Sequence, residues 1–214
     1  MTNFIPIFPL SLVVYPGELL NLHIFEPRYK ELIHDCQANG KPFGIPTVIG
    51  QQVRELGTLV QLESIEKTYE NGEMDIRTRG LQIFRILETI PKVPEKLYGG
   101  AIVTYPENDN RGNPELMQKV VEALLELHRL LHVTKTFRTG EPTLNSYDIA
   151  HHAGLSVEEE YELLSLPLEL QRQEYLRRHL QKVIPIVAEM ESLKEKVRLN
   201  GHFRNLEGFS FNLD

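Results

Sequence analysis

Apolar and polar positions alternate in several short stretches of the first half of the chain. Leu20, Leu22 and Ile24 alternate with Asn21 and His23, which is the period of a half-buried β-strand. Four further strand-like stretches cover residues 57–69, 73–80, 81–87 and 98–106, and the proline-marked segment 4–10 is typical of an edge strand. The pattern therefore predicts a β-rich unit over residues 1–106.

Two signals predict how this unit turns. Asn71-Gly72 separates two strand-like stretches, and this dipeptide favours a tight type I′ hairpin because both central residues there need a positive φ. One helix is predicted over residues 27–39. Pro27 suits the first helical position, and Gly40 is a typical helix end. The inner face of this helix is predicted to hold Tyr29, Leu32, Ile33 and Cys36.

The period of the pattern changes to 3.6 after a polar, turn-rich linker at residues 106–114, which predicts an α-helical unit over residues 114–214. Asn113 and Pro114 are predicted to cap and open its first helix, whose inner face would hold Leu116, Val120, Leu124, Leu127 and Leu131. A short helix is expected near 146–153, and Ser156 with Glu159 forms a capping-box pattern for the next one.

A long helical stretch follows at residues 169–199. Pro185 lies inside it, so the helix is predicted to be kinked or split there. Its first half has the charge pattern of a solvated face, with a weak interaction surface as the alternative. The residues of this pattern are Arg177 and Arg178, the bases Arg172 and Lys182, and the interleaved acids Glu169 and Glu174. The tail, residues 201–214, carries Phe203, Phe209 and Phe211 and is predicted to dock on the body.

Composition and charge argue against nucleic-acid and membrane partners. The 214 residues have a formal net charge of −7, spread evenly, and lack the basic half that a nucleic-acid partner would require. Cys36 is the only cysteine, so no intrachain disulfide is possible. No leader and no run of about 18 apolar residues is seen. We expect a soluble, cytoplasmic protein without membrane or nucleic-acid partners.

Motifs for common catalytic and metal sites are absent. Gly40-Lys41 is followed by Pro42 and cannot build a phosphate-binding loop, and no G-x-S-x-G is present. His128 and His132 have the i, i+4 spacing of metal ligands, yet the cation Arg129 follows the first. We therefore predict no metal and no cofactor. Cys36, on an apolar helix face, is interpreted as a packing residue.

A hydrolytic site remains an alternative. It would combine Ser146, Asp148 and either His151 or His152, which are close in sequence. On a helix, Asp148 and His152 could approach each other at i, i+4, whereas Ser146 would lie at the helix cap and bond to backbone N–H groups.

Several motifs in order resemble the N-terminal, substrate-recognition region of ATP-dependent Lon proteases. They are FPL…VVYPGELLNLHIFEPRYKELI, then PFGI, then LGTLVQLESIEKTYENGEMDIRTRGLQIFRI, and finally SYDIAHHAGLSVEEEYELLSLPLELQRQEYLRRHL. The resemblance implies an α+β fold, a PUA-like pseudobarrel followed by a helical bundle. The ATPase and protease modules of full Lon proteases are not in this chain, so we expect no peptidase or ATPase activity.

The resemblance also implies a non-catalytic module that recognises unfolded or extended polypeptide segments, with protein-quality-control proteins as further candidate partners. Candidate contact residues are Tyr15, Phe25, Tyr69 and Tyr98, aromatics near the first strands and turns; a core position is the favoured interpretation for Phe25. The alternative function is an adaptor or scaffold acting through the long helix. The oligomeric state stays open.

The stretch Glu26-Pro27-Arg28-Tyr29 places an acid, a proline and an arginine inside an otherwise apolar segment. Because Pro27 is predicted to begin a helix directly after a strand, Glu26 is placed to accept N–H groups of the first turn. Arg28 is close enough to share a network with that acid or with a carboxylate of another strand. We predict a structural role for these residues at the corner between strand and helix.

Overall fold

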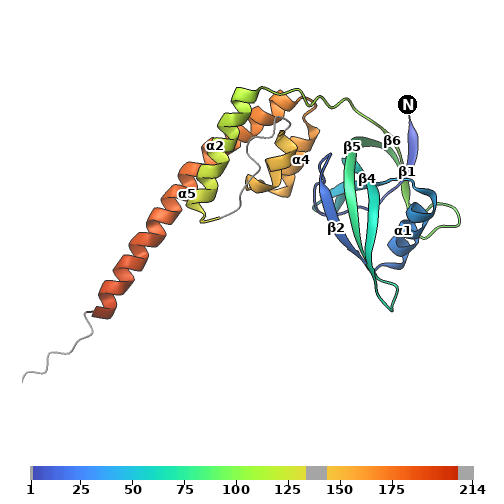
Figure 1. The fold of residues 1–214 in the computed structure, drawn as a ribbon, viewed down its shortest axis with the longest axis horizontal. Helices are drawn as coiled ribbons and strands as arrows, with labels where there is room; N and C mark the ends of the chain where they lie inside the picture. The colour runs from blue at the N-terminus through green and yellow to red at the C-terminus, as the bar shows by residue number, and fades with distance from the viewer. Residues whose placement is uncertain (1, 134–143, 207–214) are drawn as a thin grey trace, which may run out of the picture.

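The computed structural model describes residues 2–133 and 144–206, and for residues 199–206 it describes the backbone alone. Its strands all lie before Pro106, and the helices α2 to α5 all follow Asn113 (Figure 1). We call these two regions the β part and the helical part.

The β part is an antiparallel sheet that closes into a barrel. Its strands are β1 (Asn3–Pro6), β2 (Leu19–Ile24), β3 (Phe43–Ile49), β4 (Gln52–Thr68), β5 (Met74–Ile90) and β6 (Gly100–Thr104). The order is β1-β6-β5-β4-β3, with β2 paired to the first half of β5. Bridges from Ile7 to Gly44 and from Leu10 to Thr47 connect the chain after β1 to β3 and so close the barrel.

Three features of the sheet differ from the sequence pattern. The predicted strands 73–80 and 81–87 are one strand, β5, with an irregular register against β4 near Leu59 and Val60. β3 has no alternating pattern because its first five residues are all buried. The hairpin at Asn71-Gly72 forms, yet only Gly72 has a positive φ, at 74°. The turn is therefore a three-residue loop that ends at a left-handed glycine, and a type I′ turn is not formed.

Helix α1 (Pro27–Asn39) begins and ends as predicted, with Gly40 at φ 68°. Its apolar stripe is buried, and burial raises the pKa of the Cys36 thiol to about 11, as expected for a packing residue. The predicted cap is wrong, because the Glu26 side chain bonds to no backbone N–H of the helix. Glu26 instead accepts a hydrogen bond from Nε of Arg28 at 2.9 Å.

The helical part contains α2 (Pro114–Leu130), α3 (Ser146–Ile149), the short 3₁₀ helix η1 (Ala150–His152), α4 (Val157–Ser165) and α5 (Glu169–Leu206). The caps at Asn113 and Ser156 are confirmed. Asn145, and not Ser146, caps α3, because the Ser146 hydroxyl donates to Glu169. On α2, Met117 is buried in place of Leu116, and Leu131 is exposed.

Helix α5 continues through Pro185 without a break and includes residues 201–206, which were predicted to belong to a docked tail. Phe209 and Phe211 lie outside the described residues. The prediction of a solvated face in the first half of α5 holds for Arg177 and Arg178, which pair with Glu174 at the surface, and is wrong for Glu169 and Arg172. Arg172 and Glu169 are fully buried and form an ion pair at 3.0 Å.

Acceptors from the linker and from Leu166, directly after α4, bind the remaining donors of Arg172. Its Nη1 donates to Asn108 Oδ1 and to the Leu166 carbonyl, and its Nη2 donates to the Asp109 carbonyl and Asn110 Oδ1. The guanidinium also stacks 4.3 Å from the Tyr147 ring. A fully bonded guanidinium can lie buried because no donor is left without an acceptor.

One hydrophobic cluster spans both parts of the molecule. The β part contributes Val13, Tyr15, Leu56 and Ile83, which pack with apolar residues of α2, α3, α4 and α5. The Tyr15 hydroxyl donates to the Glu160 carbonyl, and the Tyr161 hydroxyl accepts from the Leu56 N–H. The predicted division at residues 106–114 therefore coincides with a change of structure type, while the core continues across it.

Candidate polypeptide-binding site

An apolar pocket of about 180 Å³ opens on the β part, where α1 meets the loop between β5 and β6. Its walls come from four separate stretches of the chain. The lining residues are Ile7, Pro9, Arg28, Tyr29, Val53, Thr89, Ile90, Pro91, Leu97 and Gly99. Leu97 and Val53 are 58% and 45% exposed, so two apolar side chains stand at its rim in contact with water.

Helix α1 holds the loop that carries Leu97. The Tyr98 hydroxyl donates to Asp35 Oδ2 at 2.6 Å, and the Leu97 N–H donates to Glu31 Oε2 at 2.8 Å. Lys96 pairs with the same Asp35 carboxylate at 2.5 Å. Lys96 and Tyr98 together lower the pKa of Asp35. Because the backbone and two side chains of the loop are tied to α1, Leu97 is held outward at the pocket.

Arg28 and Tyr29 form the α1 side of the pocket. The Arg28 guanidinium lies 4.6 Å from the centre of the Tyr29 ring, and its Nη2 is 2.7 Å from Glu26. The Tyr29 ring in turn packs 3.9 Å from the ring of Phe8. The corner between strand and helix thus fixes one cation at the edge of an apolar hollow.

The four aromatic residues proposed as peptide contacts do not come together. Tyr15 is fully buried in the cluster between the two parts, and Tyr98 is buried beneath the pocket loop. Phe25 is 60% exposed, so its interpretation as a core residue is wrong. Tyr69 is half-buried and donates to Asp75 at 2.7 Å.

Phe25 and Tyr69 lie near a second polar cluster centred on His23. The His23 ring is 6.2 Å from the ring of Phe25 and 5.7 Å from that of Tyr69. Its Nδ1 lies 2.7 Å from Asp75, and this hydrogen bond raises the pKa of His23. Thus only Tyr98, of the four, supports the apolar pocket, and it does so from below.

Pocket residues that the sequence pattern does not indicate include Val53, Pro91 and Leu97. Each lies at the end of a strand or in a loop, where no period marks an apolar side chain as exposed. The fold alone brings them to Arg28.

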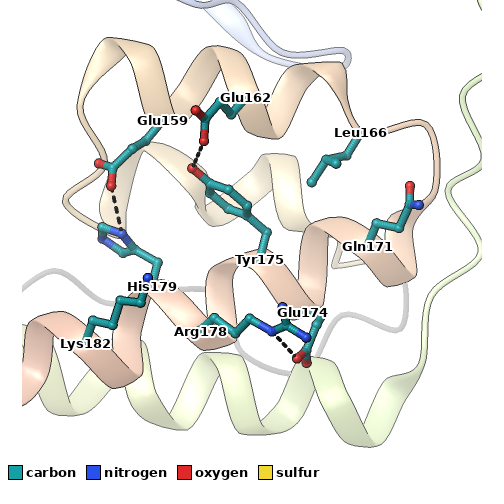
Figure 2. A pocket seen from close by; sticks show the side chains of 9 residues that line it. All are labelled: Glu159, Glu162, Leu166, Gln171, Glu174, Tyr175, Arg178, His179 and Lys182. Carbon is teal, nitrogen blue, oxygen red and sulfur yellow. Dashed lines mark hydrogen bonds and ion pairs between the residues drawn. The ribbon is translucent and has the colours of Figure 1, made fainter.

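A larger groove of about 520 Å³ lies between α4 and α5, as Figure 2 shows. Its α4 side carries Glu159 and Glu162, and its α5 side carries Tyr175, Arg178 and His179. Glu162 accepts a hydrogen bond from the Tyr175 hydroxyl at 2.9 Å, and Glu159 lies 3.4 Å from His179. This groove is charged on both walls and differs in chemistry from the apolar pocket of the β part.

The residues of the alternative hydrolytic site are directed to different partners. Ser146 donates to Glu169, and the Asp148 carboxylate accepts from the Asn145 N–H. The His151 ring contacts Glu160 and Glu18, and neither carboxylate belongs to the proposed set. Ser146, Asp148 and His151 therefore do not assemble a triad. Within residues 2–133 and 144–206, no group of three or more His, Cys, Asp or Glu side chains could hold a metal ion.

Comparison with known proteins matches residues 5–182 to the ATP-dependent protease La (LON) substrate-binding domain family. The chain belongs to this family. A crystal structure of a Lon N-terminal domain protein from Xanthomonas campestris is 27% identical, with a TM-score of 0.61, over 81% of this chain and 96% of that one.

The N-terminal domain of the Lon protease of the Mycobacterium avium complex has the same fold. It is 14% identical with a TM-score of 0.62, over 84% of this chain and 98% of that one. The α+β fold predicted for the Lon substrate-binding domain family is confirmed, and a helical region follows the sheet. No helix in the described part of the chain has the length and hydropathy needed to cross a membrane.

Proposed function

We propose that this member of the Lon substrate-binding domain family is a non-catalytic module that binds unfolded or extended polypeptide segments through the pocket of the β part. The observation that carries the proposal is the pair of exposed apolar side chains, Leu97 and Val53, at the rim of an apolar hollow beside Arg28. A pocket of this size suits one apolar side chain of an extended segment, which is how peptide-binding grooves obtain specificity.

The surroundings of the pocket support this role in two ways. Arg28 lines the hollow, and its Nε and Nη2 are held by Glu26. A peptide carbonyl or carboxylate that enters the pocket would therefore meet a cation that is already fixed in place. The loop with Leu97 is fixed to α1 before any ligand arrives, so little order must be gained on binding.

Binding can be measured by fluorescence anisotropy with a labelled, extended apolar peptide. Leu97→Asp places a carboxylate at the rim, and we expect a loss of affinity of tenfold or more, since a charge would be desolvated on binding. Leu81→Asp is the matched control, because Leu81 is 44% exposed on the same sheet and lines none of the pockets described above.

An unfolded protein should compete with the labelled peptide, whereas its folded form should not. Equal affinities of the Leu97→Asp and Leu81→Asp variants would reject the pocket as the binding site. Anisotropy that stays constant with the unmodified protein would reject polypeptide binding itself.

A second candidate function is that of an adaptor acting through the helical part. The groove between α4 and α5 supports it, because two acids of α4, Glu159 and Glu162, line the same hollow as two bases of α5, Arg178 and Lys182 (Figure 2). Charged grooves of this kind suit a folded, polar partner. A double substitution, Glu159→Lys with Glu162→Lys, should then abolish partner capture and leave peptide anisotropy unchanged.

A further inference from the structure

The second half of α5 carries an exposed apolar stripe that no described element covers. Ile186, Met190, Leu193 and Val197 are each 54–63% exposed. Their spacings of four, three and four residues place all of them on one face of the helix. Figure 1 shows that this half of α5 extends beyond the end of α2 as a single helix.

This stripe lies beside the face that α5 packs on the body and adjoins it at Val183, which is seven residues before Met190. Val183, Ile184 and Val187 are partly buried against the core shared by the two parts. Ile186 is one residue before Val187 and so points about 100° away from it. The stripe also begins after residue 182, where the match to the Lon substrate-binding domain family ends.

We propose that this stripe is the dimer interface of the protein and that a second copy packs on it as an antiparallel two-helix coiled coil. The 4-3-4 spacing is that of the a and d positions of a heptad repeat. In the antiparallel arrangement Ile186 pairs with Val197 of the second copy, and Met190 pairs with Leu193 of the second copy.

The charges beside the stripe are self-complementary. Residues 186–198 hold three acids and three bases: Glu189, Glu191, Glu195, Lys194, Lys196 and Arg198. A helix that binds membrane surfaces would carry an excess of basic residues, and a helix that binds a strongly charged partner would carry one sign. Equal numbers of both signs favour a second copy of the same helix.

Glu189 and Lys196 favour the antiparallel direction of packing, because the other four charged residues are not equally available. Lys194 pairs with Glu191, and Arg198 pairs with Glu195, within the helix. Glu189 and Lys196 have no ion-pair partner within the described residues. With Met190 and Val197 at a positions, the residue directly before each of them, Glu189 or Lys196, is at the g position that flanks the stripe. In antiparallel coiled coils the g positions face each other, so Glu189 comes opposite Lys196 of the second copy. A parallel pair would instead bring Glu189 to the already paired Lys194.

The second half of α5 is already helical before a second copy binds. An isolated two-heptad helix is marginal in water because nucleation is unfavourable. Here the first half of α5 is packed in the core, so the second half extends from a helix that already exists. The contact is short, and we expect a weak dimer whose population rises with concentration.

Sedimentation equilibrium over a concentration series tests the dimer. The unmodified protein should shift from monomer to dimer mass as concentration rises. Leu193→Glu should remain monomeric throughout, while Ser192→Glu, with the same charge one residue away and off the stripe, should behave as the unmodified protein. Both sites are exposed, so thermal unfolding of the variants should be unchanged.

Cross-linking tests the direction of packing. Ile186→Cys and Val197→Cys proteins should form a disulfide-linked dimer only when mixed, because equal positions in an antiparallel pair are about 16 Å apart along the axis. The native Cys36 is buried and does not compete. Glu189→Lys should weaken the dimer, and adding Lys196→Glu should restore it.

A monomer mass for the unmodified protein at every concentration would overturn the proposal. Equal dimerisation of the Leu193→Glu and unmodified proteins would also overturn it. Cross-linking of Ile186→Cys with itself, together with no rescue by Lys196→Glu, would overturn the antiparallel arrangement.

Discussion

The Nε2 atom of His151 lies 3.1 Å from a carboxylate oxygen of Glu18, across the junction between the helical part and the β part. The other ring nitrogen lies 2.7 Å from Glu160 of α4. Burial acts to lower the pKa of His151, but the hydrogen bonds to Glu160 and Glu18 outweigh it and raise this pKa to about 9. A charged imidazolium is therefore bound between two acids.

This arrangement predicts a pH-dependent free energy of unfolding. The pKa is higher in the folded protein than the value of about 6.5 in an unfolded chain, so the stabilisation is complete below pH 6.5 and is lost as the pH rises through 9. The His151 side chain is 33% exposed, which screens the interaction, and we expect a change of about 1–2 kcal/mol.

Urea unfolding between pH 6 and pH 9.5 measures this change. His151→Gln should flatten the curve over that range. His34→Gln is the control, because His34 is an exposed residue of α1, and its curve should match that of the unmodified protein. A His151→Gln protein with the original pH dependence would contradict the assignment.

Removing Arg172 should destabilise the protein strongly. Arg172→Ala would leave the Glu169 carboxylate buried without its cation, and the Leu166 carbonyl and Asn110 Oδ1 without the donors that Arg172 supplies, at a cost of about 3–5 kcal/mol. Arg172→Lys should restore little of this, because an ammonium cannot reproduce the planar set of donors. The Arg172→Met/Glu169→Gln double variant should lose less than Arg172→Ala. Denaturant midpoints would show the opposite order if the ion pair were unimportant.

Tyr98→Phe should weaken peptide binding without removing any pocket-lining atom. The substitution deletes the hydroxyl that donates to Asp35, so the loop carrying Leu97 loses one of its ties to α1. We expect a loss of stability of about 1 kcal/mol and a several-fold loss of peptide affinity in the anisotropy assay. Tyr69→Phe, which removes a similar bond to Asp75 in the hairpin, should leave affinity unchanged.

Arg28→Ala should distinguish a structural role of Arg28, through its ion pair with Glu26, from a role in peptide binding. The ion pair with Glu26 is exposed, at 52% and 38% for the two side chains, so its loss should cost less than about 1 kcal/mol. The free energy of peptide binding should change more than the free energy of unfolding, because Arg28 lines the pocket. A large drop in the melting temperature with unchanged affinity would assign Arg28 to structure alone. Glu26→Gln serves as the comparison.

The local parts of the fold could be predicted from sequence because their causes are local. Gly40 ends α1, and Asn113 and Ser156 cap the helices that follow them, since each depends on a few neighbouring residues. Burial of Arg172 could not be predicted in this way. Its acceptors come from Asn108, Asp109, Asn110 and Leu166, and only the fold brings the linker to that helix.

The same contrast applies to the candidate sites. The segment Glu26–Tyr29 was prominent in the sequence because polar residues interrupt an apolar run. The apolar rim residues Val53 and Leu97 gave no such signal, because an exposed apolar side chain in a loop looks like any other. Tyr15 shows the reverse, since an aromatic beside a turn suggested a surface contact while its ring is enclosed between the two parts.

The shared core has a consequence for proteolysis. The linker that runs through Arg111 is the sole covalent connection between the two parts, and the Val13 and Tyr15 cluster also joins them by packing. A chain cleaved once after Arg111 would therefore stay a single particle, with both fragments eluting together until denaturant is added. A β fragment produced alone would expose the apolar face formed by Val13, Tyr15, Leu56 and Ile83, and it should aggregate unless the helical fragment is supplied with it.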